Sequence, residues 1–248
     1  MRKIRSIAPL SFSLQTMPQH GKKYREAAKR VNRDKLYDAK EAIALVKKTS
    51  SVSFDATVEI HVPTMANVKH ADQVVRSTTI LPAGTGKTKR IAVFADGGQE
   101  AEAKKAGADV IGGEDLIEKV TKGEIDFDIA IATPKMMRSL AKAARVLGPK
   151  GLMPSPKSGT VTDDIAAAVE ELKKGKIEFR TDKTGIIHSI IGKVSFSEED
   201  LLENLKAIMK AILQNKPTGV KGTFLKGIFL SSTMGPGIAL SPSDPLWK

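Results

Sequence analysis

The chain has 248 residues, 41% of them hydrophobic, a formal charge of +12 and no cysteine. This length suits one large domain or two of ordinary size, each with its own core. No apolar run approaches the roughly 18 residues that a membrane span needs. The lack of cysteine excludes disulfides, thiolate metal sites and a thiol nucleophile.

The basic excess is concentrated at the N-terminus. Residues 1–37 contain ten basic and two acidic residues, whereas residues 82–174 contain fifteen basic and fourteen acidic ones. A localised positive charge is typical of a protein that binds a nucleic-acid backbone, because neutralised phosphates release counterions. The alternative is a solvated basic arm.

The first sixteen residues carry three basic residues and no acids, which resembles a short organellar transit peptide. Pro9 would interrupt an amphipathic helix, and Met17 offers an alternative start. We interpret residues 1–16 as a disordered extension.

The segment that follows predicts two helices and a strand. Residues 21–35 place cations on nearly every side, so a helix here would lie on RNA or on the protein surface. Asp38 predicts the cap of an amphipathic helix. Residues 54–62 alternate apolar and polar side chains, which indicates a strand with one solvated face.

Residues 81–88, LPAGTGKT, have the composition of a phosphate-binding loop but not its spacing. The position five before Gly86 is Leu81 rather than glycine. We therefore predict a turn or interdomain hinge. A nucleotide-dependent enzyme that uses this loop remains the rival hypothesis.

Residues 82–174 alternate short apolar strands with helices, which predicts a parallel sheet covered on both faces. No GxGxxG follows the first strand, so a dinucleotide site is not expected. The prediction is a three-layer Rossmann-like α/β domain with strands at 91–95, 109–111 and 129–132, and helices at 99–106, 114–121, 134–146 and from Asp163 or Asp164 to Lys174.

Residues 147–162, LGPKGLMPSPKSGTVT, fit neither a helical nor a strand period. Three prolines fix their own φ and bias the preceding residues towards extended geometry. We predict a shaped, exposed loop that is either a binding element or a rigid strut.

The alternation returns after residue 175. It predicts a hairpin of strands 176–180 and 185–191, a helix from Ser197 to about residue 213, a last strand at 223–232 and a disordered tail at 241–248. Residues 17–81 and 175–240 would then form a discontinuous two-layer α+β domain that carries residues 82–174 as an insert. Two connections between the domains permit hinge motion.

No catalytic site, metal site or cofactor is predicted. The four histidines, at positions 20, 61, 70 and 188, lack metal-ligand spacing, and no serine lies in a GxSxG motif. His188 is interpreted as a hydrogen-bonded structural histidine. Aromatic residues make up only 4%, which favours recognition of RNA through shape, phosphate and 2′-hydroxyl contacts over base stacking.

Seven collinear motifs between Met17 and about Ala239 resemble the universal L-one family of large-subunit ribosomal proteins, in its bacterial type. They are MPQHGKKY, FDATVEIHV, LPAGTGK, FDIAIATP, LGPKGLMPSPKSGTVT, IEFRTDKTGIIH and STMGPG. The resemblance implies a non-catalytic, monomeric protein of the mobile side stalk that binds large-subunit rRNA and assists release of exit-site tRNA. Many members also repress translation of their own mRNA.

The resemblance also implies a location and a set of binding residues. The protein is expected in the cytoplasm on the ribosome and not at a membrane, or on an organellar ribosome if residues 1–16 are a transit peptide. Lys150 and Lys157 are possible secondary RNA contacts. The primary RNA contacts carried over are Phe54, Thr57, Asp182, Lys183, Thr184, Thr233, Met234 and Gly235.

Local structure is the alternative explanation for several of these residues. Phe54 would suit a core, Asp182 a turn and Gly235 a strand end. Residues 62–77 depart from the family pattern, so Lys69 and Arg76 receive no role.

Overall fold

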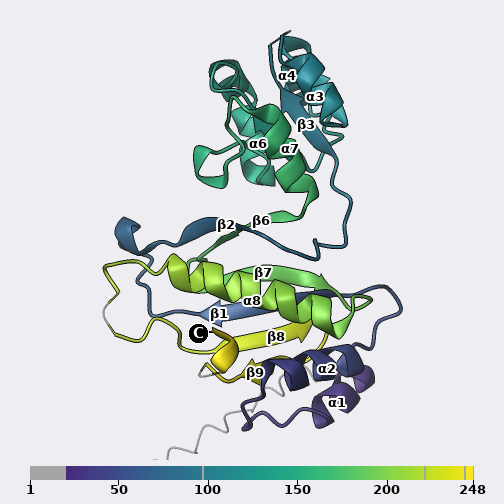
Figure 1. The fold of residues 1–248 in the computed structure, drawn as a ribbon, viewed down its shortest axis with the longest axis vertical. Helices are drawn as coiled ribbons and strands as arrows, with labels where there is room; N and C mark the ends of the chain where they lie inside the picture. Colours follow the sequence, from purple (N-terminus) through teal and green to yellow (C-terminus); the bar gives the residue numbers. More distant parts are fainter. Residues whose placement is uncertain (1–20, 97, 221, 243, 248) are drawn as a thin grey trace, which may run out of the picture.

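The computed structural model describes residues 21–96, 98–220, 222–242 and 244–247. The predicted extension at residues 1–16 lies outside them. Helices and strands are mixed throughout, as predicted for the α/β class, and the strands form three separate sheets (Figure 1). Within the described ranges, no helix combines the length and the apolar character needed to cross a bilayer.

The largest sheet has four antiparallel strands in the order β7-β1-β8-β9. Its strands are β1 (Thr57–Pro63), β7 (Ile186–Lys193), β8 (Ile228–Ser232) and β9 (Ile238–Leu240). Strand β1 begins three residues later than predicted, and β9 was not predicted at all. One face of the sheet packs against two helices, and the other carries the half-buried and exposed residues of the alternation.

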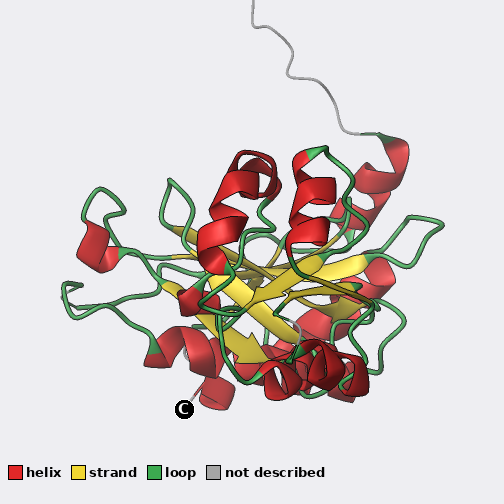
Figure 2. Ribbon diagram, turned by 90° about the horizontal axis from the view of Figure 1, so that it is seen from above, coloured by secondary structure: helices red, strands yellow, loops and turns green. Residues whose placement is uncertain are grey.

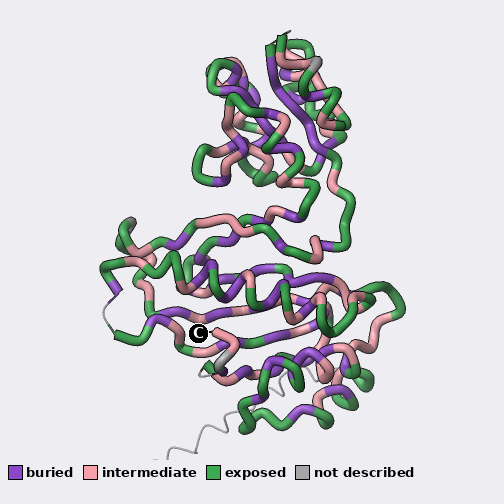
Figure 3. Tube along the Cα trace, in the orientation of Figure 1, coloured by how far each residue is buried: buried purple, intermediate pink, exposed green. Residues whose placement is uncertain are grey.

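The helices behind this sheet are α2 (Ala39–Thr49) and α8 (Glu198–Gln214), and α1 (Lys22–Lys29) precedes them. Helix α8 begins as predicted, because the Ser197 hydroxyl accepts a hydrogen bond from the Asp200 amide at 3.0 Å. Its apolar face is fully buried in a core to which residues between 31 and 81 and between 177 and 247 contribute. Purple tube marks this core along the inner strands in Figure 3.

The C-terminal tail corrects two predictions. Asp38 stands at the N-cap of α2, but its side chain makes no cap hydrogen bond. Asp244 does this instead, since its carboxylate accepts from the Ala39 amide at 3.1 Å. The tail forms a 3₁₀ turn, η4 (Pro245–Trp247), whose Trp247 packs on the core. It is therefore not disordered at these residues.

The predicted hairpin is also wrong. Strand β6 (Lys176–Arg180) pairs with β2 (Arg76–Ile80) as a two-stranded antiparallel ribbon, whereas β7 pairs with β1. A single bridge between Thr181 and Ile187 connects the two successive strands. The ribbon lies between the four-stranded sheet and the remaining part of the chain (Figure 1). A short 3₁₀ turn, η1 (Ala71–Gln73), precedes it.

The third sheet is parallel, with β3 (Ile91–Phe94) between β4 (Val110–Gly112) and β5 (Ile129–Ala132). Alternate residues of its strands enter two different cores, one on each face. Helices α3 (Glu100–Lys105) and α7 (Ile165–Lys173) cover one face. Helices α4 (Glu114–Thr121), α5 (Met137–Leu140) and α6 (Ala144–Lys150), with the turn η2 (Ala141–Ala143), cover the other. Figure 2 shows helices on both sides of the strands.

Residues 147–162 are less exposed and more regular than predicted. Residues 147–150 belong to α6, although Pro149 lies inside this helix and lacks the amide that would bind the carbonyl of Arg145. Gly151 ends the helix in the left-handed region, at φ 71°. The hydroxyls of Ser158 and Thr160 are buried and hydrogen-bonded to each other beside the turn η3 (Pro156–Ser158).

Candidate nucleic-acid interface

The structure divides the predicted contact residues between the two ends of the four-stranded sheet. Thr57 begins β1, and Thr233 follows directly after β8 at the same end. Residues 182–184 lie in the turn before β7, whose first residue, Ile186, pairs with Pro63 at the opposite end. A seven-residue strand is about 20 Å long, so the two groups form separate sites on one elongated face.

Hydrogen bonds between Thr57 and Thr233 connect β1 to the residues after β8 at the first end of the sheet, where β1 begins. The Thr57 amide donates to the Thr233 hydroxyl at 3.1 Å, and the Thr233 amide donates to the Thr57 carbonyl at 3.0 Å. The Thr233 hydroxyl also donates to that carbonyl at 3.3 Å. Its hydrogen is therefore committed to the protein, and an oxygen lone pair is what remains for a ligand.

Met234 is displayed at this end in a strained conformation. Its φ is 66°, and no other non-glycine residue in the described part of the chain has a positive φ. Its side chain is 76% exposed, and Phe54, three residues before Thr57, is 56% exposed. The core interpretation of Phe54 is therefore wrong. A left-handed methionine costs about 1–2 kcal/mol, and burial does not compensate for it here.

Gly235 completes the turn after β8. Its amide donates to the Ser232 carbonyl at 2.7 Å. A Cβ at this position would overlap the Ser232 hydroxyl oxygen, so only glycine fits without a shift. The residue therefore has a clear structural reason to be glycine.

Asp182 organises the second end. Its carboxylate accepts from the Ile186 amide at 2.8 Å and from the Thr184 amide and hydroxyl at 2.8 and 2.7 Å. These bonds hold the pKa of Asp182 well below its usual value. Gly185 has a positive φ of 83°, as a glycine in a tight turn can. Asp182 is thus the turn former, while Lys183 and Thr184 are exposed.

Six outward-facing side chains join the two ends, and we call them the central open face. They are Glu59, His61, His188, Ile190, Phe229 and Ser231. Register places His61 opposite both His188 and Phe229, and Glu59 opposite both Ile190 and Ser231. The sequence indicates a structural role for His188, and none of the six is predicted from it as a binding residue. The alternation of β1 and β7 was the signal that could have identified them.

The two lysines predicted as secondary contacts lie away from this face. Lys150 is the last residue of α6, and Lys157 lies in η3. Both side chains are exposed on the part of the chain that carries the parallel sheet. The structure therefore does not bring them together with the other predicted residues.

The glycine-rich loop is held as a turn. Gly84 and Gly86 have positive φ, and Asn204 of α8 binds the loop through the Ala83 amide and the Gly84 carbonyl, at 3.0 Å each. A cavity of about 590 Å³ adjoins it. Of its cations, Lys173 donates to the carbonyls of residues 106 and 107 and is not free for a phosphate.

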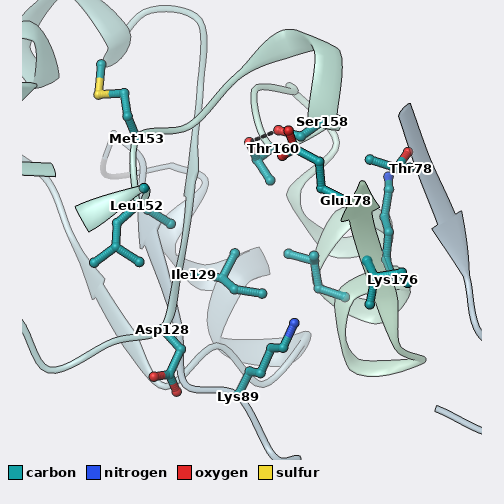
Figure 4. A pocket seen from close by; sticks show the side chains of 14 residues that line it. Thr78, Lys89, Asp128, Ile129, Leu152, Met153, Ser158, Thr160, Lys176 and Glu178 are labelled. Atoms are coloured by element: carbon teal, nitrogen blue, oxygen red, sulfur yellow. Dashed lines mark hydrogen bonds between the residues drawn. The ribbon is translucent and has the colours of Figure 1, made fainter. Parts of the chain in front are cut away.

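A smaller cavity of about 180 Å³ lies between the ribbon and the parallel sheet (Figure 4). Lys89 extends toward the space between Ile129 and Lys176, and burial lowers the pKa of Lys89. The nearby Ser158 and Thr160 hydroxyls bind each other. The lining thus mixes apolar groups with polar groups, and Asp128, Lys176 and Glu178 are also hydrogen-bonded within the protein. Across the described residues, no three metal-ligating side chains come together.

Comparison with known proteins agrees with the motifs. Residues 46–236 match the model of the ribosomal protein L1p/L10e family. The large ribosomal subunit proteins uL1 of Thermosipho melanesiensis and Thermosipho africanus are each 54% identical over 228 residues, which cover 92% of this chain and 98% of theirs. The chain therefore belongs to the ribosomal protein L1p/L10e family, whose members are structural and non-enzymatic, as the sequence motifs predicted.

Proposed function

We propose that the protein binds large-subunit rRNA through the central open face and the two ends that flank it. The contacts would be Phe54, Thr57, Thr233, Met234 and Gly235 at one end. Residues 182–184 would supply contacts at the other. Family membership supports a role in the large ribosomal subunit.

The observation that carries the site assignment is the conformation of Met234. A strained backbone that displays an apolar side chain to solvent reduces stability, so another function must account for it. Exposed Phe54 at the same end adds a second apolar surface for a sugar or base edge. The backbone bonds between Thr57 and Thr233 hold this display in place.

Crosslinking in cells, followed by sequencing of the bound RNA, tests the proposal. We expect one structured segment of large-subunit rRNA to dominate the fragments from the native protein. Met234→Ala should reduce its recovery, whereas Leu36→Ala, which truncates another exposed apolar side chain, before α2, should not. Equal recovery from both variants would refute the site assignment.

We propose further that the chain is divided into a discontinuous RNA-binding domain, residues 17–81 and 175–240, and an inserted domain, residues 82–174. The inserted domain would swing as part of the mobile side stalk and assist release of exit-site tRNA. The paired connections near residues 81 and 175 support such a motion. The protein would act as a monomer within the ribosome.

Exposed Lys150 and Lys157 are candidates for the tRNA contact on the inserted domain. Replacing both with glutamate should slow the release of labelled deacylated tRNA from the exit site without weakening rRNA binding. An unchanged release rate would exclude them.

Repression of the protein's own mRNA would use the same RNA-binding face. A reporter that carries the native leader should be repressed by the native protein and less so by Met234→Ala. Repression that is indifferent to this substitution would place any mRNA contact elsewhere.

A further inference from the structure

Four polar side chains on and beside the central open face form a continuous hydrogen-bonded chain. The Ser231 hydroxyl lies 3.0 Å from Nε2 of His61, and Nδ1 of His61 lies 2.8 Å from Nδ1 of His188. Nε2 of His188 lies 3.5 Å from the Asp182 carboxylate. The chain runs from β8 across β1 and β7 to the turn at the second end of the sheet.

The chemistry of these groups fixes the direction of every bond when both imidazoles are neutral. The Asp182 carboxylate only accepts, so Nε2 of His188 carries the hydrogen and its Nδ1 is an acceptor. Nδ1 of His61 must then donate, which leaves Nε2 of His61 to accept from the Ser231 hydroxyl. In this state Ser231 presents only oxygen lone pairs to a ligand.

One added proton reverses the Ser231 end of the chain. Protonation of Nε2 of His61 makes this nitrogen a donor to the Ser231 oxygen and releases the serine hydrogen towards solvent. Nδ1 of His61 continues to donate to His188, so the rest of the chain is unchanged. The site then offers a positive charge and a free hydroxyl donor, both of which suit a phosphate oxygen.

Protonation of His61 would change the net charge of the central open face, because few charged side chains lie on it. The central open face contains no lysine or arginine, and its one permanent charge is that of Glu59, 3.9 Å from Nε2 of His61. His188, with Asp182 behind it, faces His61 from β7, and Phe229 and Ser231 face it from β8. Burial first, and His188 second, lower the pKa of His61, so neutral pH leaves it uncharged in the free protein.

We propose that this hydrogen-bonded chain of side chains binds a phosphate group of RNA, and that His61 takes up a proton from solvent when the RNA binds. The inference rests on the proposed rRNA-binding function. A phosphate brought to the face stabilises the imidazolium, so proton uptake and RNA binding strengthen each other. Affinity should then rise as the pH falls, by at most about tenfold per pH unit for one linked proton.

Binding of in vitro transcribed large-subunit rRNA to the full chain, at constant ionic strength from about pH 5.5 to about pH 8, tests this coupling. The native protein should bind more tightly as the pH falls, and His61→Gln should lose most of that increase. His70→Gln is the matched control, because His70 is exposed on a loop and does not belong to the hydrogen-bonded chain of His61 and His188. It should keep the native pH profile.

A second measurement separates proton uptake from other effects of pH. Calorimetric binding heats in two buffers of different ionisation enthalpy should show proton uptake by the native protein and by His70→Gln, and less by His61→Gln. Thermal unfolding of His61→Gln checks that the variant is folded.

Two results would overturn the inference alone: binding that does not change with pH, or an increase that His61→Gln retains. Absence of rRNA binding at every pH would overturn the proposed function together with it.

Discussion

Met234 is the residue whose conformation and exposure are least explained by packing. Replacing it with glycine should relieve the left-handed strain while adding chain entropy to the unfolded state, so stability should change by less than about 1 kcal/mol. Removing the side chain should nevertheless weaken rRNA binding by about 1–3 kcal/mol. Urea unfolding and RNA titration of Met234→Gly measure the two effects separately.

The combination distinguishes a binding residue from a structural one. A large loss of stability with unchanged affinity would show that the Met234 side chain serves the fold. Leu36→Ala should change neither quantity appreciably, because Leu36 is exposed and lies outside the proposed interface.

Asp182 should make stability depend on pH in acid. Its pKa lies below the unfolded value of 3.8, so its contribution is complete above that value and is lost as the pH falls below it. The difference in unfolding free energy between the native protein and Asp182→Asn should be constant from about pH 5 to about pH 7 and shrink below about pH 4. Parallel stability curves in urea across this range would contradict the prediction.

The structural roles of residues that interact only with their near neighbours in the sequence were predictable. Ser197 and Asp164 cap their helices, and Gly185 adopts positive φ, because each depends on local backbone chemistry. Met234 and Asn204 could not be recognised in this way. Methionine has no preference for the left-handed region, and the partners of Asn204 are distant in sequence.

At the scale of elements, the cap of α2 offers a matched pair of aspartates. Asp244 is 7% exposed and accepts from the amides of Ala39 and Leu246, whereas Asp38 makes no cap bond. Asp244→Ala should therefore destabilise the protein by about 1–2 kcal/mol, and Asp38→Ala by no more than about 0.5 kcal/mol. Thermal unfolding of the two variants measures the difference. The reverse order would show that Asp38 is the functional cap in solution.

Strands were easier to predict than their partners. The alternation in residues 54–62 and the apolar run at 91–95 predicted β1 and β3. Each strand could be recognised because the order of apolar and polar residues within the segment itself reflects which side chains are buried. Nothing local to residues 176–191 states that β6 pairs with β2 while β7 pairs with β1. Strand β9 has three residues, too few for a period to show.

At the scale of the whole molecule, kinship with bacterial relatives confirms the prediction of a cytoplasmic ribosomal protein. The division of the chain into two domains stays a prediction, and so do the individual RNA contacts. Patterns of charge and hydrophobicity indicated the class of partner. The path of the interface depends on the register of β1 with β7 and β8.

Asn204 connects the main core to the segment that leads to the parallel sheet. It is fully buried, accepts from the Ala83 amide and donates to the carbonyls of Gly84 and Ile191. Asn204→Leu would leave all three backbone groups without their hydrogen-bond partner and should reduce the free energy of unfolding by about 2–4 kcal/mol. Urea unfolding should show a much smaller loss for Asn215→Ala, which removes one bond at the end of the same helix. Equal losses would contradict the role given to Asn204.

The two connections to the parallel sheet pass close to each other where they leave the main core. The Leu81 amide donates to the Gly175 carbonyl at 3.2 Å, and a Cβ on Gly175 would lie 2.8 Å from Cα of Gly84. A body joined at two adjacent points cannot turn freely in every direction as one on a single tether does. Its easiest motion is rotation about the line through both points. Lys150 and Lys157 would then travel along one arc rather than explore a volume.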